Sequence, residues 1–205
     1  MRHRSHPDKR RLATAGLLTL ALLLTACATP SPPSRFYRLT PEAPVTERRS
    51  DLVVGIGPVL LAGYLDRPQL VTPLGDNQLR VDEFERWAGG LENNLATVMA
   101  ENLSRLLGSD AVVTQPWASR LPIDYQVALE IRRLEPNADG QVHLVAQWRL
   151  FRGDGEALVG IHRSTFTEPM SGTGYAARAA AESRVLVPLA RAIADAIRAA
   201  EKKRR

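Results

Sequence analysis

Residues 125–150 read YQVALEIRRLEPNADGQVHLVAQWRL, and this stretch decides the fold. Apolar and polar side chains alternate in both of its halves, as they do in a strand that buries one face. Between the halves, NADG at 137–140 suits a tight turn, and GDG at 153–155 repeats the signal. Trp148 then falls on the buried face and His143 on the opposite face. We therefore expect an antiparallel meander whose strands cover residues 123–134, 141–152 and 156–167.

Two helical patterns flank this meander. Apolar residues recur at steps of three and four across residues 91–107, and Gly108 suits the left-handed conformation that ends a helix. Residues 175–200 are rich in alanine with one apolar stripe, and Pro188 predicts a kink because it lacks a backbone donor. Strands with two segregated helices predict an α+β domain of two layers, a mainly antiparallel sheet with two helices packed on it. Shorter strands are expected at residues 36–39, 51–61, 69–72, 78–81 and 111–114.

The N-terminus has the pattern of a lipoprotein signal. Five basic residues precede thirteen uncharged residues, and Leu24-Thr25-Ala26-Cys27 follows. The apolar run is shorter than the roughly 20 residues of a membrane span. Cys27 is the sole cysteine of the sequence, and a thiolate is the nucleophile that accepts a diacylglyceryl group. We predict a signal peptide at residues 1–26, a lipidated Cys27 and a Pro/Ser-rich tether within 27–35; an ordinary secretory signal followed by a buried cysteine is the alternative.

Charge argues against nucleic acid as a partner. The sequence holds 27 basic and 22 acidic residues. The predicted signal contains five of the basic residues and one of the acidic residues. The remaining 22 basic and 21 acidic residues leave a net charge of +1, too small for a nucleic-acid footprint. Residues 36–200 are long enough for one domain. Residues 201–205 form a basic tail, which we expect to be a disordered solubilising end, with a contact to anionic headgroups or peptidoglycan as the alternative.

No catalytic or metal-binding pattern stands out. His143 and His162 are the two histidines after the predicted signal, and the meander places them on different strands. The sequence has no Gly-x-Ser-x-Gly elbow, which disfavours a hydrolase. Gly55-Ile56-Gly57-Pro58 lacks the third glycine and the following helix of a phosphate loop. We therefore expect no enzyme activity, no cofactor and no metal.

A family resemblance comes from the residues around Tyr64. Tyr64-Leu65-Asp66-Arg67-Pro68-Gln69 is followed by Phe84-Glu85-Arg86-Trp87 and by a helix that ends Leu106-Leu107-Gly108. With the lipobox and the opening strand Phe36-Tyr37-Arg38-Leu39, this order resembles the ABC-type transport auxiliary lipoproteins, the PqiC-like family of the paraquat-inducible membrane-integrity system. Gly89-Gly90 departs from the family pattern, which has a proline before the helix, so the resemblance leaves the exact helix start open.

The resemblance implies a non-enzymatic lipoprotein that docks a lipid transporter at the outer membrane. Its partner would be an MCE-domain protein of a Pqi-type or ABC transporter, and a homo-oligomeric ring of copies would match the symmetric rim of an MCE tube. Residue 28 is alanine, and in similar lipoproteins an aspartate there favours the inner membrane, so we expect the outer membrane. An envelope structural or assembly lipoprotein without lipid cargo is the alternative function.

The candidate docking residues implied by this resemblance are Tyr64, Asp66, Arg67 and Trp87. Aromatic and guanidinium side chains dominate the binding energy of protein interfaces, which favours these residue types. A structural role is the alternative for the same residues. In that case Asp66 and Arg67 pair to brace a turn, Pro68 fixes the chain direction, and Trp87 packs in the core.

Overall fold

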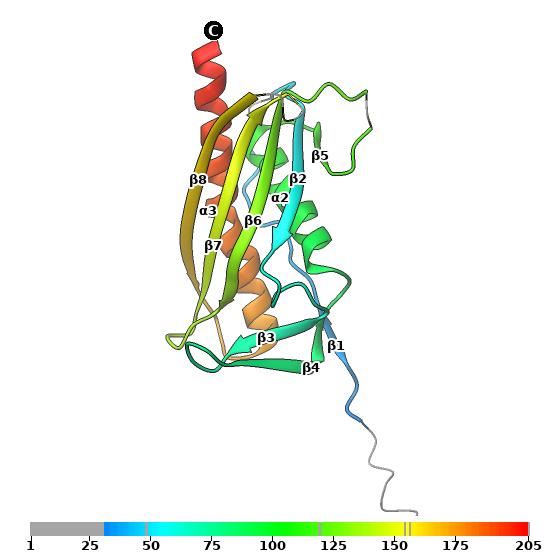
Figure 1. The fold of residues 1–205 in the computed structure, drawn as a ribbon, viewed down its shortest axis with the longest axis vertical. Helices are drawn as coiled ribbons and strands as arrows, with labels where there is room; N and C mark the ends of the chain where they lie inside the picture. Colours follow the sequence, from blue (N-terminus) through cyan, green and yellow to red (C-terminus); the bar gives the residue numbers. More distant parts are fainter. Residues whose placement is uncertain (1–30, 48, 119, 154, 156, 205) are drawn as a thin grey trace, which may run out of the picture. The chain divides into compact units, whose positions relative to one another are not determined.

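The predicted meander is present and makes up most of a five-stranded sheet in the computed structural model (Figure 1). Its strands are β6 (Tyr125–Pro136), β7 (Gln141–Arg152) and β8 (Ala157–Pro169), paired antiparallel in chain order. Trp148 is 2% exposed, while His143 is half-buried on the opposite face. The alternation of the sequence therefore predicted the pairing and the faces of Trp148 and His143, whereas the bulge in β6 between Ile131 and Arg133 and the burial of Gln126 and Ala128 were not predicted.

The structure describes residues 31–47, 49–118, 120–153, 155 and 157–204. The predicted signal peptide and Cys27 lie outside these described residues. Residues 34–205 form one unit by their internal contacts, and the description below concerns that unit. Among the described residues, no helix combines the length and apolar character that crossing a membrane requires.

Two further strands lengthen the sheet with parallel pairings. β2 (Val54–Leu61) lies beside β6, and β5 (Val112–Thr114) lies beside β2, which gives the order β5-β2-β6-β7-β8. The remaining strands, β1 (Arg35–Tyr37), β3 (Gln69–Pro73) and β4 (Leu79–Trp87), form a separate sheet in the order β1-β4-β3, called the small sheet below. The α+β class is confirmed, and both sheets mix parallel with antiparallel pairs.

The strand predicted at residues 78–81 is too short, because β4 continues to Trp87. The added residues, 82–87, are mostly charged and carry no clean alternation. They are extended because β4 lies between two partners: β3 pairs with it antiparallel and β1 pairs with it parallel. A bulge between Gln69 and Leu70 shifts the register within the β3–β4 pair. Tertiary pairing thus decides this strand, which local pattern alone did not reveal.

Both predicted helices are present. α2 (Leu91–Leu107) begins after Gly90, which is extended, and ends at Gly108, whose φ of 68° is left-handed. Gly90 thus fixes the helix start that the family resemblance left open. α3 (Tyr175–Arg204) contains Pro188 and continues through Lys202 and Lys203. The expectation of a disordered basic tail is therefore wrong for residues 201–204, because these residues extend the helix.

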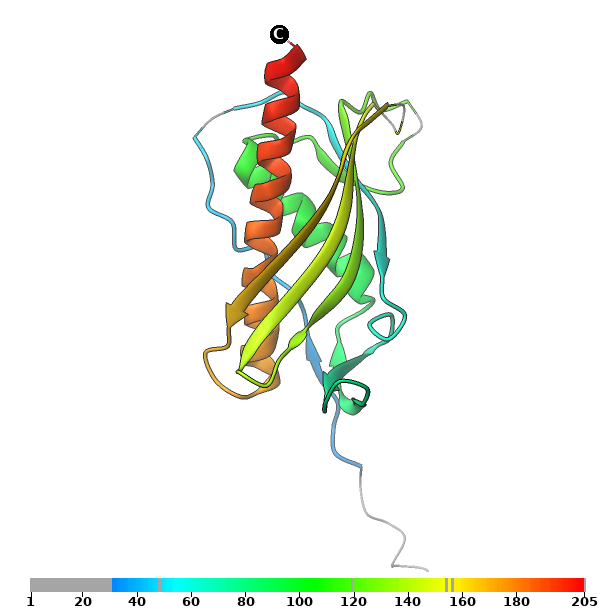
Figure 2. The ribbon, with the colours of Figure 1, turned by 60° about the vertical axis from the view of Figure 1, so that its left-hand side comes forward.

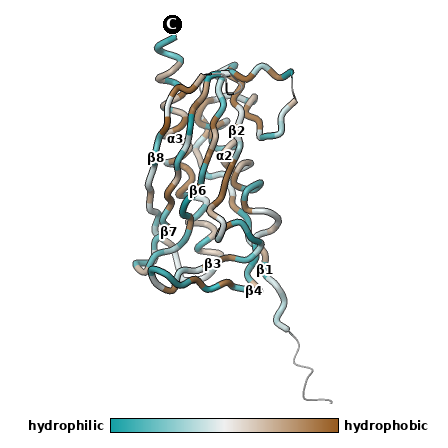
Figure 3. Tube along the Cα trace, viewed as in Figure 1, coloured by the Kyte–Doolittle hydropathy of each residue, from teal (hydrophilic) through white to brown (hydrophobic). Residues whose placement is uncertain are grey.

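The main core lies between the five-stranded sheet and the two helices, which cover the same face of it (Figures 1 and 2). The apolar stripe of α3 is fully buried, and each such side chain contributes about 1.5–3 kcal/mol to stability. Figure 3 shows hydrophobic residues recurring along β2, β6 and α2, whereas the last turns of α3 are hydrophilic. The residues of the α3 stripe are Val185, Leu186, Leu189, Ile193 and Ile197.

Candidate functional site

The predicted docking residues begin on the loop between β2 and β3, residues 62–68, which we call the docking loop. Two backbone hydrogen bonds close it: Leu65 N donates to Ala62 O at 2.8 Å, and Arg67 N donates to Leu65 O at 2.9 Å. Leu65 is 4% exposed and packs into the core. Because Leu65 anchors the turn from inside, the next two residues, Asp66 and Arg67, are held at the surface, where both are exposed.

Trp87 meets this loop through the backbone and faces the core with its side chain. Its N–H donates to Pro68 O at 2.7 Å, and the residue is 5% exposed. Tyr64 is half-buried, and its hydroxyl lies 3.4 Å from Arg132 O. Burial, and then Glu135, raise the pKa of the Tyr64 hydroxyl, so it is a neutral donor. The structure thus brings the four predicted residues together, with Asp66 and Arg67 fully at the surface and Trp87 in the core.

The structural alternative for these residues is right in one part and wrong in another. Trp87 packs in the core as that alternative stated. The brace between Asp66 and Arg67 is wrong, because within the described residues neither side chain makes a hydrogen bond or an ion pair. The backbone bonds of Leu65 and Arg67 close the turn instead. Both charges therefore remain available to a partner.

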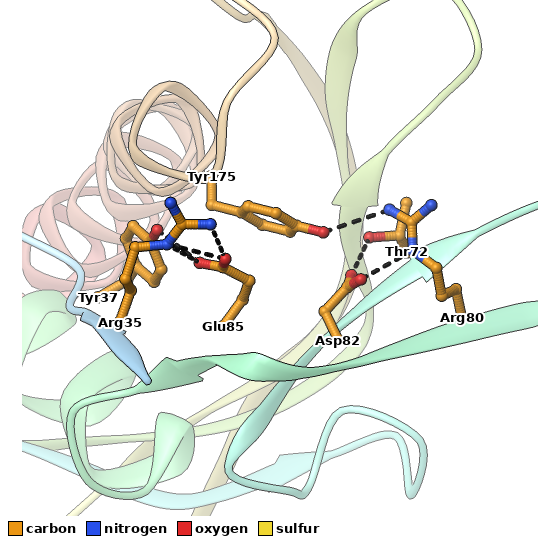
Figure 4. A network of polar contacts seen from close by, with 7 residues as sticks. All are labelled: Arg35, Tyr37, Thr72, Arg80, Asp82, Glu85 and Tyr175. Atoms are coloured by element: carbon orange, nitrogen blue, oxygen red, sulfur yellow. Dashed lines mark hydrogen bonds and ion pairs between the residues drawn. The ribbon is translucent and has the colours of Figure 1, made fainter. Parts of the chain in front are cut away.

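A polar network holds the small sheet together and begins at Glu85 on β4 (Figure 4). Arg35 Nε donates to both carboxylate oxygens of Glu85, at 2.9 and 3.1 Å, and its Nη2 also pairs with this carboxylate. Tyr37 Oη donates to Glu85 Oε2 at 2.6 Å. The hydrogen bonds from Arg35, and then from Tyr37, lower the pKa of Glu85 although the residue is 6% exposed. These contacts fasten β1 to β4.

The second half of the network connects β4 to the first residue of α3 (Figure 4). Asp82 accepts hydrogen bonds from Arg80 Nε at 2.8 Å and from Thr72 Oγ1 at 2.9 Å. Arg80 Nη2 then donates to Tyr175 Oη at 3.2 Å. The ring of Tyr175 lies 6.2 Å from that of Tyr37, which joins the two halves through an aromatic contact. The small sheet is thus attached to the helix start by side chains rather than by a ladder.

A buried ion pair adds a third attachment between the small sheet and α3. Arg178 Nε donates to Glu182 Oε1 at 2.8 Å, and Arg178 Nη1 donates to Val71 O on β3 at 2.9 Å. Glu182 is fully buried, and burial raises the pKa of its carboxyl. Among the described residues, Glu182 Oε2 and Glu135 Oε2 are buried without a hydrogen-bond partner. A buried carboxylate is costly to leave unpaired, and Arg178 is the residue that pairs with Glu182. The attachment of the small sheet to α3 therefore depends on Arg178.

Sequence reasoning missed these attachments for two reasons. Arg35 and Glu85 are 50 residues apart, and Arg178 and Val71 are 107 apart, so no local pattern links them. Arg178 and Glu182 stand at the i, i+4 spacing of a helical ion pair, which is a visible signal. On a helix rich in alanine, that spacing usually marks a solvated face, and burial can be recognised only once β3 is placed.

The two histidines lie on different strands, β7 and β8, as predicted, and the glycine motif lies within a strand. His162 stacks on Trp148 with ring centroids 4.1 Å apart and an interplanar angle of 19°. Gly55 and Gly57 lie inside β2 rather than before a helix, so they cannot present a helix N-terminus to a phosphate. Within the part of the chain that the structure describes, no group of three or more His, Cys, Asp or Glu side chains is placed to hold a metal ion.

Comparison with known proteins gives one family and several similar folds. Residues 37–194 match the family described as the ABC-type transport auxiliary lipoprotein component. A crystal structure of a Xanthomonas campestris protein from the family DUF330 superimposes with a TM-score of 0.68 at 18% identity, covering 83% of this chain and 100% of the other. A second crystal structure, of an uncharacterised protein, superimposes with a TM-score of 0.65 at 20% sequence identity. The match covers 81% of this chain and 99% of the other. No curated protein matches significantly.

Proposed function

The chain belongs to the family of ABC-type transport auxiliary lipoprotein components, and from this premise we propose that it docks a lipid transporter at the outer membrane. In this proposal it is a subunit of an MCE/ABC-type system that spans the periplasm. It is anchored by acylated Cys27 on the periplasmic face and binds the tube of an MCE-domain protein of a Pqi-type or ABC transporter. It contributes attachment and has no catalytic role.

The sequence Leu24-Thr25-Ala26-Cys27 and the match to a lipoprotein family support the membrane part of this proposal. A single acyl chain binds a bilayer only marginally, with a partition constant on the order of 10⁴ M⁻¹, whereas a diacylglyceryl group with an N-acyl chain attaches firmly. Residues 28–34 are rich in proline and serine, and as a semi-extended tether at ~3.1 Å per residue they reach on the order of 20 Å. The folded unit would therefore stay close to the bilayer.

The observation that carries the docking part is that the end of β4 links the docking loop to β1. β1 starts at Arg35, just after the predicted tether, and Tyr37 O on this strand accepts a hydrogen bond from Ala88 N at 2.7 Å. The neighbouring Trp87 N donates to Pro68 O at 2.7 Å, so two adjacent residues at the end of β4 bond to β1 and to the docking loop. A partner bound at Arg67 would therefore be held near the point where the chain leaves for the membrane.

Copurification tests this function directly. The mature lipoprotein, extracted from outer membranes in detergent, should retain the MCE protein, and Arg67→Glu should release it. Arg163→Glu is the matched control, because Arg163 is also exposed but lies on β8. A lipoprotein that stays in the outer membrane without retaining any MCE protein would favour the structural alternative without lipid cargo. Equal retention by both variants would remove the docking loop from the interface.

A second prediction tests the proposed acylation of Cys27. Cys27→Ser should abolish acylation and move the protein out of the outer-membrane fraction, because the proposed diacylglyceryl group is attached through the thiol. Intact-mass analysis and membrane fractionation are the measurements. A wild-type mature chain that lacks the lipid mass, or that begins at another residue, would contradict the assignment of Cys27.

The assembly that we propose for this function is a homo-oligomeric ring. An MCE tube has a rotationally symmetric rim, so a closed ring of copies would occupy its equivalent sites and add weak contacts at high effective concentration. Light scattering on the mature lipoprotein with its MCE partner measures the number of copies. A strict monomer, both alone and in the complex, would exclude the ring.

A further inference from the structure

A groove lies between β5 and α2, on the sheet edge opposite β8. Its volume is about 530 Å³, within the range of ligand-binding sites. One wall is a single face of α2, the other is β5, and the segment after β5 closes one side. The lining residues include Glu101, Asp110, Val112, Thr114 and Trp117.

The floor of this groove is an unpaired strand edge. Val54 N donates to Ala111 O and Gln115 N donates to Ile56 O, both at 3.0 Å. In a parallel pair every second residue bonds the partner, so residues 111, 113 and 115 bond β2 through their backbone groups. Val112 and Thr114 therefore direct their N–H and C=O groups away from β2. Within the described residues no hydrogen bond of these groups is found, and β5 ends the strand order.

The wall after β5 is fixed in place by contact with β2. A Cβ on Gly55 would lie 3.0 Å from two ring carbons of Trp117, so the indole rests directly on the backbone of β2. Gly57 has a φ of 144°, and a Cβ there would lie 2.6 Å from the Cβ of Gln115. The two glycines of the motif that resembles a phosphate loop thus make room for this wall. The groove is preformed, which lowers the entropy cost of binding.

The charge of the groove selects its ligand. Its charged lining residues are both acidic, Glu101 and Asp110, and none of the described lining residues is basic. Glu101 pairs with Arg105 through Oε1 at 2.9 Å, and its side chain is still 49% exposed, so its carboxylate can be reached by a ligand. Asp110 is exposed and makes no hydrogen bond or ion pair to the described residues. An acidic groove beside free backbone groups suits an extended chain with basic side chains.

We propose that the groove between β5 and α2 binds an extended, basic peptide segment of another protein, which adds to β5 as a further strand of the sheet. The backbone N–H and C=O groups of Val112 and Thr114 pair with the segment. Alternate side chains of the segment then face Asp110 and Glu101, while the intervening ones contact Trp117. This surface is separate from the docking loop, and the proposal stands whether or not the docking loop binds an MCE protein.

The test uses two labelled hexapeptides on the mature lipoprotein in detergent micelles. Alternating Lys-Val repeats should bind in a fluorescence anisotropy titration. Alternating Glu-Val repeats should bind at least about tenfold more weakly, because their carboxylates are repelled by the acidic side chains of the groove. Bound Lys-Val peptide should protect the amides of Val112 and Thr114 from hydrogen exchange, as strand addition requires. Absence of Lys-Val binding, or binding without this protection, would overturn the proposal.

Two variants separate the backbone contribution from the charge contribution. Thr114→Pro removes one outward N–H, which an edge strand tolerates, and should weaken Lys-Val binding at least about tenfold. Asp110→Lys reverses one charge without touching the ladder and should weaken it similarly. Glu92→Lys is the matched control, because Glu92 is exposed on α2 but does not line the groove. Equal binding by Asp110→Lys and Glu92→Lys would overturn the proposal, even if Thr114→Pro fails to fold.

Discussion

Trp148 in the five-stranded sheet and Glu85 in the small sheet are both almost fully buried, at 2% and 6% exposure, yet different neighbours hold them. Trp148 belongs to the apolar core, where Leu129 is its cross-strand partner, and its indole also stacks on His162 and donates to Ser164 Oγ at 3.1 Å. Glu85 is held by a guanidinium and a phenol. The large sheet is therefore stabilised by a broad apolar core, whereas the small sheet adds a network of hydrogen bonds and charges to its few core residues, such as Leu70 and Trp87.

This difference indicates which part of the domain responds to its surroundings. Apolar burial does not change with pH, whereas a carboxylate network loses its bonds on protonation and is screened by salt where it is exposed. The docking loop leads directly into β3 of the small sheet. We expect the small sheet to open locally before the large sheet does, because most of its residues outside Leu70, Val71, Glu85 and Trp87 are not fully buried.

The largest effect is expected in the large sheet. Trp148→Ala should lower the free energy of unfolding by about 3–5 kcal/mol, since it leaves a cavity against α3 and removes the stacking partner of His162. His143→Ala, on the opposite face of the same strand, should cost little. Chemical denaturation of both variants measures the difference. Equal costs would contradict the assignment of apolar burial to one face of the meander.

The second-largest loss of stability is expected from breaking the buried ion pair between Arg178 and Glu182. Arg178→Met leaves the buried Glu182 carboxylate unpaired and removes the bond to Val71 O, at a cost of about 3 kcal/mol. Burial already raises the pKa of Glu182, so the variant binds a proton in the folded state. Its deficit should therefore shrink as pH falls toward the ordinary pKa of glutamate and grow as pH rises above it.

The double variant Arg178→Met/Glu182→Leu is the control for this prediction. It replaces both charges with apolar side chains, so it should recover most of the lost stability. Recovery would show that the single variant is destabilised by an unpaired charge rather than by poor packing. A double variant as unstable as the single one would mean that the bond from Arg178 to Val71 O carries the joint.

The same contrast explains what the sequence could predict. Period-two alternation reveals a face, so residues 125–150 predicted the meander and the burial of Trp148, but not the bulges that shift the register after Ile131 and Leu150. Gly108 likewise marked the end of α2 because its left-handed φ has a local cause. The charged residues of the small sheet carry no such period, and their partners come from β1 and α3. Arg67 was identifiable through the family resemblance, whereas its exposure depends on Leu65 packing beneath it.

A smaller and pH-dependent effect is expected at Glu85. The pKa of its carboxyl is lowered in the folded state, so the stabilisation it provides is present above the ordinary pKa of glutamate and is lost as pH falls through the folded value. Glu85→Gln should therefore reduce the melting temperature at neutral pH, by less than Arg178→Met, and leave it nearly unchanged in acid. Added salt should narrow the difference, because the Arg35 side chain is 68% exposed. Glu92→Gln, which alters an exposed carboxylate on α2, should show no such pH dependence.

The smallest effect on stability is expected at Arg67, and it tests whether the docking loop belongs to the stabilising network or only lies beside it. Within the described residues the Arg67 side chain has no hydrogen-bond or ion-pair partner, and the turn is closed by backbone bonds that alanine keeps. Arg67→Ala should therefore change the free energy of unfolding by no more than about 0.5 kcal/mol, as exposed substitutions do. If it nevertheless weakens copurification with the MCE protein, Arg67 is a binding residue, because a structural residue would lower the melting temperature as well. A melting temperature lowered as much as in Glu85→Gln would instead place Arg67 within the network that holds the small sheet.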